Sequence, residues 1–295
     1  MVELRRNRAE PFLWLAPALA ILAIFMAYPI GFSVVLSLFQ WKGYSTQVFD
    51  RFVHLSNYLR LLHDPLYWLS FRNTLILVLN VVLVQNAVAL ALAIVVYFGR
   101  FRAGDLVRGI IFFPGVVSAV VVALVFRKFL EMDGAVNLFF QGIGLARWVT
   151  PWLTVKGLTI WIVALITVWQ WTGYSLVIFY AGIQGIDFEL LEAATIDGAS
   201  AGKLIFRIII PLLKPTIFLS ALLNFIGGFR VYEIIWVTTR GGPVHSSEVL
   251  TTYMYYNSFQ SKGPSDMSYA SAIAVTLALV VLLFAVVRVI FAKRK

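Results

Sequence analysis

The chain has 295 residues, of which 61% are hydrophobic and only 13% are charged, and its 24 Lys and Arg against 14 Asp and Glu give a net charge of +10. A soluble domain carries about 25% charged residues, so this composition excludes an ordinary soluble globule. It also excludes a disordered or nucleic-acid-coating chain, because such chains contain few apolar residues. We therefore expect an all-α integral membrane protein that is surrounded by the lipid bilayer and has no nucleic-acid partner.

The sequence contains no cysteine, and its only histidines are His54, His63 and His245. The missing cysteine excludes a disulfide framework, an iron–sulfur cluster, a thiol nucleophile and a Cys-ligated zinc site. None of the histidines lies in a long apolar stretch, so an intramembrane protease would have no histidine base. We expect no catalytic residue and no metal site.

Long apolar stretches predict the membrane spans. A bilayer core about 30 Å thick requires roughly 20 apolar residues per helix. Six stretches meet this requirement: residues 11–41, 73–99, 109–129, 157–186, 215–239 and 267–291. The first is too long for the apolar core of a signal peptide and should be retained as a helix. No internal repeat or Gly/Ser-rich linker divides the chain, so we expect residues 1–295 to form a single transmembrane domain.

The distribution of Lys and Arg predicts the orientation in the membrane. The two terminal segments and residues 98–108 and 187–214 together hold thirteen of them, whereas the intervening loops hold ten in a longer stretch of chain. Cytoplasmic loops are richer in Lys and Arg than loops on the other side. We therefore expect both termini to be cytoplasmic.

Residues 187–214, between the fourth and fifth spans, carry the most informative pattern. Asp187 can cap the N-terminus of a helix, and Gly198 suits the left-handed residue that ends it. The helix between them is acidic at positions such as Glu192 and has no Lys or Arg before Lys203. A helix that rests on lipid headgroups normally presents cations, so we favour a docking surface for another protein over a lipid-resting helix.

Within this segment, Glu-Ala-Ala is followed by Asp-Gly-Ala and by an apolar run that ends in Pro. This arrangement resembles the EAA loop of permease subunits in binding-protein-dependent ABC importers. The matching residues are Glu192, Ala193, Ala194, Asp197, Gly198, Ala199, Ile208 and Pro211. The resemblance implies that the loop couples the chain to a separate ATPase.

Further patterns in the same order extend the resemblance over nearly the whole chain. They include Asn57-Tyr58 in the first outer loop, Phe113-Pro114 in the third span and Gly241-Gly-Pro243 in the last outer loop. They look like the carbohydrate and glycerol-phosphate branch of the family, which includes maltose importers. The resemblance implies the type I ABC importer permease fold, in the cytoplasmic membrane of a bacterium or archaeon, and a sugar or related polyol as the solute.

The resemblance also implies partners. These are a second permease subunit, two ATPase subunits and an extracytoplasmic solute-binding protein. We expect the second permease to be a different chain, with a homodimer as the alternative. The stretch from Gly198 to Leu204 is superficially like a phosphate-binding loop, but it has three residues between its glycines instead of four and lacks the Ser or Thr that holds Mg²⁺. We therefore expect this chain to bind no cofactor, with ATP and Mg²⁺ on the partner ATPase.

Polar residues inside the spans are candidates for the solute path. Arg230 and Glu233 lie three residues apart in the fifth span, where they can pair on one helix face. Polar and small residues also recur at helical spacing in the fourth and fifth spans. The candidates are Gln170, Tyr174, Asn224, Gly228, Arg230 and Glu233. The alternatives are a structural ion pair and close helix packing, and we expect Asn80, Gln85 and Asn86 of the second span to join helices.

The alternative function is secondary active transport. Such a transporter needs inverted repeats and an intramembrane site for a proton or sodium ion. The sequence shows no repeat, and Glu233 is the only carboxylate within a span. We therefore favour the ATP-driven importer.

Overall fold

The computed structural model describes residues 10–43, 48–49, 51–99, 104–260 and 265–292. The chain divides into two compact units, residues 1–64 with 254–280 and residues 65–253 with 281–295. Four helices in the described residues are long and apolar enough to cross a membrane, or up to six if each of two bent helix pairs is one span. Part of the Lys and Arg pattern that predicts the orientation, at residues 1–9, 100–103 and 293–295, lies outside the described residues.

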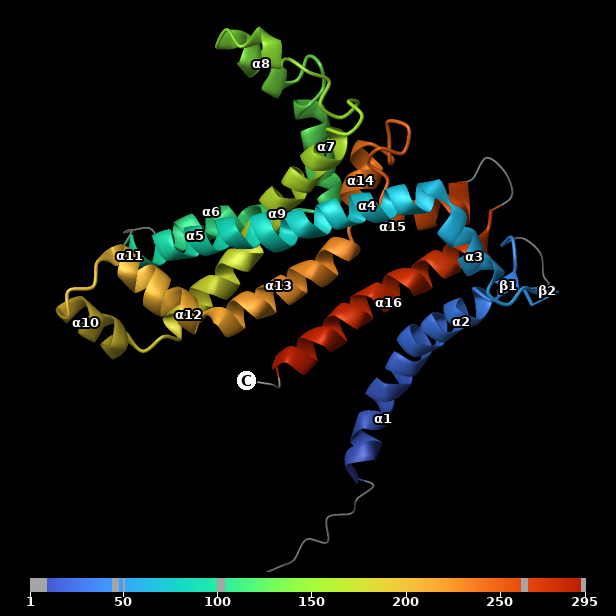
Figure 1. Ribbon diagram of the computed structural model, residues 1–295, viewed down its shortest axis with the longest axis horizontal. Coiled ribbons are helices and arrows are strands. Elements are labelled where there is room, and N and C mark those ends of the chain that lie inside the picture. The colour runs from blue at the N-terminus through green and yellow to red at the C-terminus, as the bar shows by residue number, and fades with distance from the viewer. Residues whose placement is uncertain (1–9, 44–47, 50, 100–103, 261–264, 293–295) are drawn as a thin grey trace, which may run out of the picture. The chain divides into compact units, whose positions relative to one another are not determined.

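The first unit contains one long apolar helix and a small assembly of loop elements (Figure 1). Its elements are α1 (Glu10–Leu22), a π-helical turn (Ala23–Ala27), α2 (Tyr28–Leu36), β1 (Phe39–Gln40), β2 (Arg51–Phe52), α3 (Ser56–His63), a second π-helical turn (Tyr256–Gln260) and the first part of α16 (Met267–Ala292). The strands pair antiparallel, with Phe39 opposite Phe52. The first predicted span therefore ends at Leu36 and does not continue to residue 41, because the chain turns into this hairpin.

Polar side chains fix α3 in this unit. The Asn57 amide donates to the carbonyl oxygens of Ser37 and Phe39, at 2.8 and 3.0 Å, and the Tyr58 and Ser37 hydroxyls lie 2.6 Å apart. Arg60 forms an ion pair with Asp266 at 2.5 Å. The Asn57-Tyr58 pattern thus has a structural role, because it holds α3 against the end of α2.

The second unit contains the remaining helices. They are α4 (Pro65–Leu79), a π-helical turn η2 (Asn80–Gln85), α5 (Asn86–Phe98), α6 (Gly104–Val116), α7 (Ala119–Phe129), α8 (Ala135–Gly142), α9 (Thr159–Gln184), α10 (Phe188–Ile196), α11 (Ala201–Leu204), a π-helical turn η4 (Ile205–Ile209), α12 (Ile210–Leu212), α13 (Lys214–Phe229), α14 (Glu233–Thr238) and most of α15 (Leu250–Tyr255). A single-turn 3-10 helix, Ala146–Trp148, follows α8. The second span is longer than expected, because the helix begins at Pro65 and not near residue 73.

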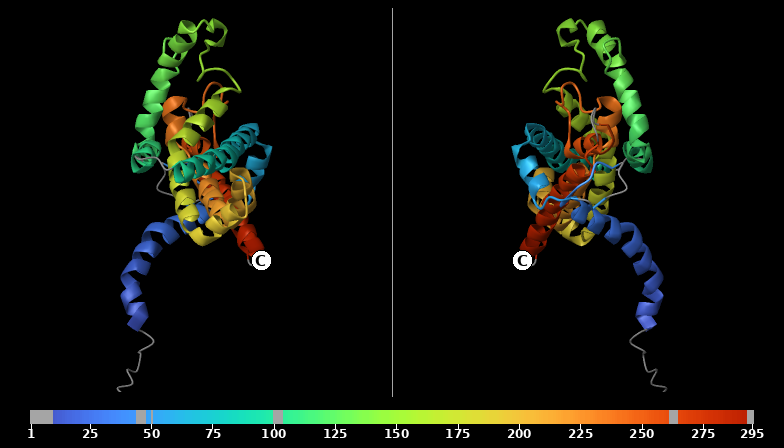
Figure 2. Two further views of the ribbon diagram at one scale, coloured as in Figure 1. Left: turned by 90° about the vertical axis from the view of Figure 1, so that its left-hand side faces the viewer. Right: turned by 90° about the vertical axis from the view of Figure 1, so that its right-hand side faces the viewer.

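The third predicted span is not one straight helix. Helices α6 and α7 meet at a bend of 93°, and Figures 1 and 2 show α7 turning away from α6. Pro114 lies inside α6 and cannot donate a backbone hydrogen bond, and Ser118 is extended, with ψ of 133°. The Gln170 amide of α9 donates to the Val117 carbonyl at 3.1 Å, so the bend has a polar partner on the neighbouring helix.

The fifth predicted span, residues 215–239, is also broken. Helix α13 ends at Phe229, just after Gly227 and Gly228, and α14 begins at Glu233. Consecutive glycines weaken a helix interior, and here the Arg230 amide bonds to the Gly227 carbonyl in a tightened last turn. Helix α13 is also preceded by Ala201–Leu212, at a bend of 65°.

Two apolar clusters hold the second unit together. The α14 cluster joins α4, α7, α9 and α14, and its buried members include Leu77, Ile160, Ile166, Ile234 and Ile235. The α10 cluster joins α5, α9, α10 and the residues before α13, and comprises Ala89, Ala93, Leu176, Phe179, Ile183, Leu191, Ile209 and Leu213. Close van der Waals packing of these side chains holds the helices of the second unit together.

A buried carboxyl group anchors the loop between α14 and α15. Glu248 is 2% exposed, its carboxylate lies 2.7 Å from Nδ1 of His245, and Asn73 donates to the carbonyl oxygens of Ser246 and Glu248. Burial raises the pKa of the Glu248 carboxyl, and the contact with His245 opposes that shift. Gly241 is required beside it, because a Cβ at this position would lie 2.6 Å from the Glu248 carboxylate.

Candidate functional site: a polar cavity and a capped helical segment

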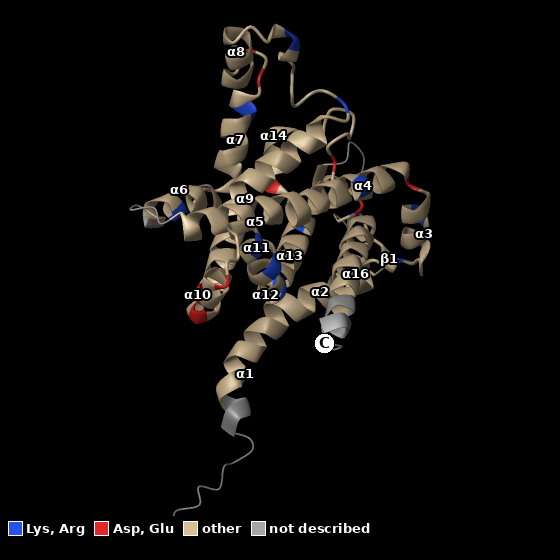
Figure 3. Ribbon diagram, turned by 60° about the vertical axis from the view of Figure 1, so that its left-hand side comes forward, with Lys and Arg blue, Asp and Glu red and all other residues tan. Residues whose placement is uncertain are grey.

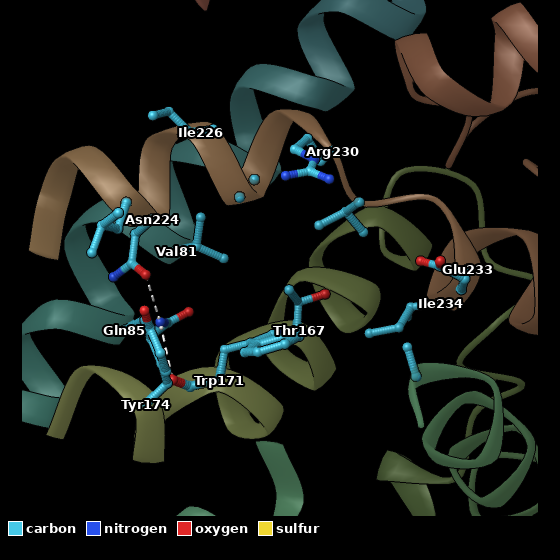
Figure 4. A pocket seen from close by; sticks show the side chains of 15 residues that line it. Val81, Gln85, Thr167, Trp171, Tyr174, Asn224, Ile226, Arg230, Glu233 and Ile234 are labelled. Carbon is cyan, nitrogen blue, oxygen red and sulfur yellow. Dashed lines mark hydrogen bonds between the residues drawn. The ribbon is translucent and has the colours of Figure 1, made fainter. Parts of the chain in front are cut away.

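A cavity of about 520 Å³ lies in the second unit, between the second span, α9 and the α13–α14 break (Figure 4). Its lining contains both apolar and polar side chains. The residues that line it are Val81, Gln85, Ala119, Thr167, Trp171, Tyr174, Leu223, Asn224, Ile226, Gly227, Gly228, Arg230, Val231, Glu233 and Ile234. Ligand sites are usually concave, largely apolar and provided with a few convergent polar groups, and this cavity has that character.

Amide and hydroxyl groups join three helices at one end of the cavity. We call Gln85, Ser175 and Asn224 the polar triad. The Gln85 amide donates to Ser175 Oγ at 2.9 Å and to Asn224 Oδ1 at 3.1 Å, and the Asn224 amide donates to Ser175 Oγ at 3.0 Å. All three residues are buried. One turn further along, Ser220 donates to Asn86 Oδ1 at 2.6 Å, so α13 is tied to α5 by a second polar contact.

Two charged side chains line the opposite end of the cavity. Arg230 follows the last residue of α13 and Glu233 is the first residue of α14, so they do not lie on one continuous helix. Among the residues that the structure describes, no ion pair joins them, and both are exposed. The predicted pairing on one helix face is therefore wrong, because α13 ends at Phe229 and α14 begins at Glu233. The two charged side chains line the cavity from separate segments (Figure 4).

Two aromatic rings of α9 form part of the wall between these ends. Trp171 and Tyr174 are 40% and 42% exposed, and their rings lie 6.4 Å apart in an edge-on arrangement. Both line the cavity together with Thr167, at positions i, i+4 and i+7 of one helix face. Exposed aromatic faces beside amide groups suit a ligand that has both apolar faces and hydroxyl groups.

Five of the six predicted path residues line this cavity: Tyr174, Asn224, Gly228, Arg230 and Glu233. Gln170 does not. It lies on the face of α9 that packs on α6, where it donates to Val117 and where a Cβ on Gly173 would collide with the backbone of Ile111 and Phe112. Gly228 has a packing role as well, because a Cβ there would lie 2.9 Å from a methyl group of Val81.

On α9 the sequence pattern identifies Tyr174 correctly, misplaces Gln170 and misses part of the lining. Thr167 and Trp171 were not among the candidates, although their spacing with Tyr174 is the signal that marks their face. Gln85 and Asn86 join helices as expected. Asn80 does not, since its amide donates to the Ile76 carbonyl of its own helix at 2.8 Å.

The segment from α10 to α12 has the local geometry that its sequence predicts. The Asp187 carboxylate accepts from the Glu189 amide at 3.1 Å and caps α10, and Gly198 has φ of +78° just after the helix. Ser200 caps the next helix by accepting from the Lys203 amide. The matched residues Glu192, Ala193, Asp197 and Gly198 are exposed, while Ala194, Ala199, Ile208 and Pro211 are partly buried.

One buried side chain attaches α10 to the helix bundle. Leu191 is 5% exposed and belongs to the α10 cluster, together with Ile209 and Leu213 from the segment that follows. Figure 3 shows acidic positions on α10 and basic positions in the segment that follows, where Lys203 lies in α11 and Arg207 in η4. The segment therefore presents a charged outer face and is held to α5 and α9 by apolar contacts.

Comparison with known proteins places nearly the whole chain in one group. Residues 71–295 match the family described as "Binding-protein-dependent transport system inner membrane component". The chain is 34% identical to the lactose transport system permease protein LacF of Rhizobium radiobacter, over 92% of this chain and 89% of that protein. It is 31% identical to the sn-glycerol-3-phosphate transport system permease protein UgpA of Yersinia pestis bv. Antiqua, over 97% of this chain and 94% of that protein.

A solved structure has the same fold. A chain of a bacterial ABC transporter involved in the import of the acidic polysaccharide alginate superposes with a TM-score of 0.82. The match covers 96% of this chain and 94% of that chain at 22% sequence identity. The likeness at this level of identity concerns the fold.

Proposed function

Since the chain belongs to the family of binding-protein-dependent transport system inner membrane components, and is thus a multi-pass inner-membrane permease subunit of an ABC transporter, we propose that it forms half of the path for a sugar or related polyol. The observation that carries this proposal is the cavity of about 520 Å³, which combines exposed rings with amide groups inside a helix bundle. A solute rich in hydroxyl groups must find hydrogen-bond partners that lipid does not supply.

The lining supports a hydroxylated solute over an apolar one. Asn224 and Gln85 supply amide donors and acceptors, Thr167 supplies a hydroxyl, and Trp171 and Tyr174 expose ring faces. Arg230 and Glu233 add one positive and one negative charge at the far end, so the lining as a whole does not select strongly for one sign of charge. Relatives named for lactose and for glycerol 3-phosphate fit the same chemistry.

The capped segment from α10 to α12 is our proposed contact with a separate ATPase. Its matched residues are Glu192, Ala193, Ala194, Asp197, Gly198, Ala199, Ile208 and Pro211. The exposed acidic positions of α10 and the left-handed turn at Gly198 form a protruding surface of defined shape. Because Leu191 is buried against α5 and α9, a displacement of α10 would move these helices with it as a rigid body.

The other partners belong to the same proposal. A second permease subunit would supply the other half of the path, two ATPase chains would hold ATP and Mg²⁺, and a solute-binding protein would deliver the solute on the outer side. An alginate transporter of this fold is known in complex with a pentasaccharide-bound periplasmic protein. We propose that both termini are cytoplasmic, which places α10 on the same side as the ATPase.

The path is tested by removing one ring from the cavity. In the complete transporter, Trp171→Ala is expected to lower ATP-driven uptake of radiolabelled lactose or glycerol 3-phosphate, whichever the wild type transports, by about tenfold, as for loss of a ring that contacts the solute. The matched control is Trp161→Ala, since Trp161 lies on the same helix with 48% exposure but does not line the cavity.

Both variants should assemble and hydrolyse ATP at the wild-type rate without solute. Equal uptake by Trp171→Ala, Trp161→Ala and the wild type would show that the cavity is not the path. An equal loss in both variants would show that the rings serve only as general contacts with lipid or neighbouring helices.

A further inference from the structure

The polar triad lies at the end of the cavity that faces the α10 segment. Gln85 follows Val81 along the second span toward α5, and Tyr174 follows Thr167 and Trp171 toward the end of α9. Asn224 lies on α13, before the end of that helix and Arg230. All three helices run from here to the α10 cluster. Figure 4 shows Gln85, Asn224 and Tyr174 together at one end and Arg230 and Glu233 at the other.

Beyond the triad the helices are in close contact. Ser220 and Asn86 are joined at 2.6 Å, and a Cβ on Gly182 would lie 2.9 Å from side-chain atoms of Leu213 and Thr216. The α10 cluster fills the next layer. A solute that leaves the cavity in this direction must therefore first separate α13, from Ser220 onward, from α5 and α9.

The contact that must open first is entirely polar and uncharged. Separation of α13 breaks the Gln85–Asn224 and Asn224–Ser175 hydrogen bonds. It leaves the Asn224 amide unpaired among apolar side chains, while Gln85 keeps its bonds to Ser175 and to the Trp171 carbonyl. Such unpaired groups are costly in surroundings that hold little water. The empty cavity is therefore biased toward the closed arrangement.

A hydroxyl-rich solute changes this balance. Each of its hydroxyl groups both donates and accepts, which matches the donor and acceptor set that Gln85, Ser175 and Asn224 use on one another. We propose that the polar triad is a releasable closure of the cavity, whose hydrogen bonds are exchanged for bonds to the solute when α13 moves away. This inference rests on the proposed function of the cavity as the solute path.

The π-helical turn at Asn80–Gln85 supports this role. It interrupts the long helix of the second span and ends at Gln85. Such turns are uncommon and frequently occur at functional sites, because the wider turn shifts the side chains that follow it. Here it brings the Gln85 amide within hydrogen-bond distance of the Trp171 carbonyl, Ser175 and Asn224 at once.

The experiment removes the closure and measures ATP hydrolysis by the complete transporter in the absence of solute and binding protein. In Gln85→Leu, the closed arrangement loses its polar bonds, and we expect solute-independent ATP hydrolysis to rise by about tenfold. Ser175→Ala should raise it in the same direction, and it carries the test if Gln85→Leu does not assemble, because it only removes a hydroxyl group.

The matched control is Asn80→Leu, which removes an amide from the same π-helical turn but breaks only a bond to its own helix. A rise in Gln85→Leu or Ser175→Ala beyond that in Asn80→Leu supports the closure. An unchanged rate, or one equal to that of Asn80→Leu, overturns it and leaves the triad as helix packing. If uptake still depends on Trp171 in that case, the path is retained and only the closure is rejected.

Discussion

The two ends of the helix bundle in the second unit are joined by different chemistry. At the α10 end, Leu191, Ile209 and Leu213 pack with α5 and α9 in a cluster of buried apolar side chains. At the cavity, Gln85, Ser175 and Asn224 are joined by hydrogen bonds. Apolar contacts have no partner to exchange, whereas hydrogen bonds can be taken over by water or a solute. The comparison indicates that the apolar α10 cluster is a rigid joint, whereas the polar triad is a joint whose contacts can be exchanged.

The largest effect is expected from breaking the rigid joint. Leu191→Ala removes the one buried side chain of α10 and leaves a cavity, at a cost of about 2–5 kcal/mol locally. A detached α10 cannot transmit displacement, so we expect solute-dependent stimulation of ATP hydrolysis and uptake to be lost. Both are measured on the reconstituted transporter.

Leu165→Ala is the control for this prediction, because Leu165 is 53% exposed on α9. It should leave uptake and its coupling to ATP hydrolysis unchanged. Coupling that survives in Leu191→Ala would show that α10 is held to the bundle by something other than the α10 cluster.

A smaller effect is expected at the turn after α10. Gly198 has φ of +78° with open space around it, so Gly198→Ala creates no clash but places an L-residue in the left-handed region, at a cost of about 1 kcal/mol. We expect a severalfold loss of uptake with assembly intact, measured beside Gly202→Ala. Gly202 also has open space but no left-handed φ, so its variant should behave as the wild type. Equal behaviour of the two variants would mean that the shape of this turn does not matter for coupling.

The α10 segment could be predicted closely because its determinants are local. The Asp187 cap and the left-handed Gly198 depend on neighbours within a few residues. The number and approximate position of the apolar stretches follow from composition for the same reason. The sequence pattern did not predict that the third and fifth spans are each broken into two helices. The breaks lie near Pro114 and just after Gly227 and Gly228, which the hydropathy of the spans does not reveal.

The cavity was predictable only in part because several helices far apart in sequence build it. Periodicity places Gln170 and Tyr174 near each other, but the contact of Gly173 with α6 turns Gln170 toward the bend and Tyr174 toward the cavity. The sequence predicts that Gln85 joins two helices, and its hydrogen bond to Asn224 confirms this. The pattern of a single helix does not show which other helices Gln85 contacts. It therefore does not predict that this contact lies at the end of a cavity.

The most direct test of the rigid and exchangeable joints is a pair of distance measurements by spin labelling, for which the absence of cysteine from the chain is an advantage. Val177→Cys with Phe188→Cys spans the α9–α10 joint, and Val88→Cys with Leu219→Cys spans the α5–α13 joint at exposed positions. Between the nucleotide-free and the ATP-and-vanadate-trapped transporter, the account predicts an unchanged α9–α10 distance and a changed α5–α13 distance. A changed α9–α10 distance with a fixed α5–α13 distance would contradict it.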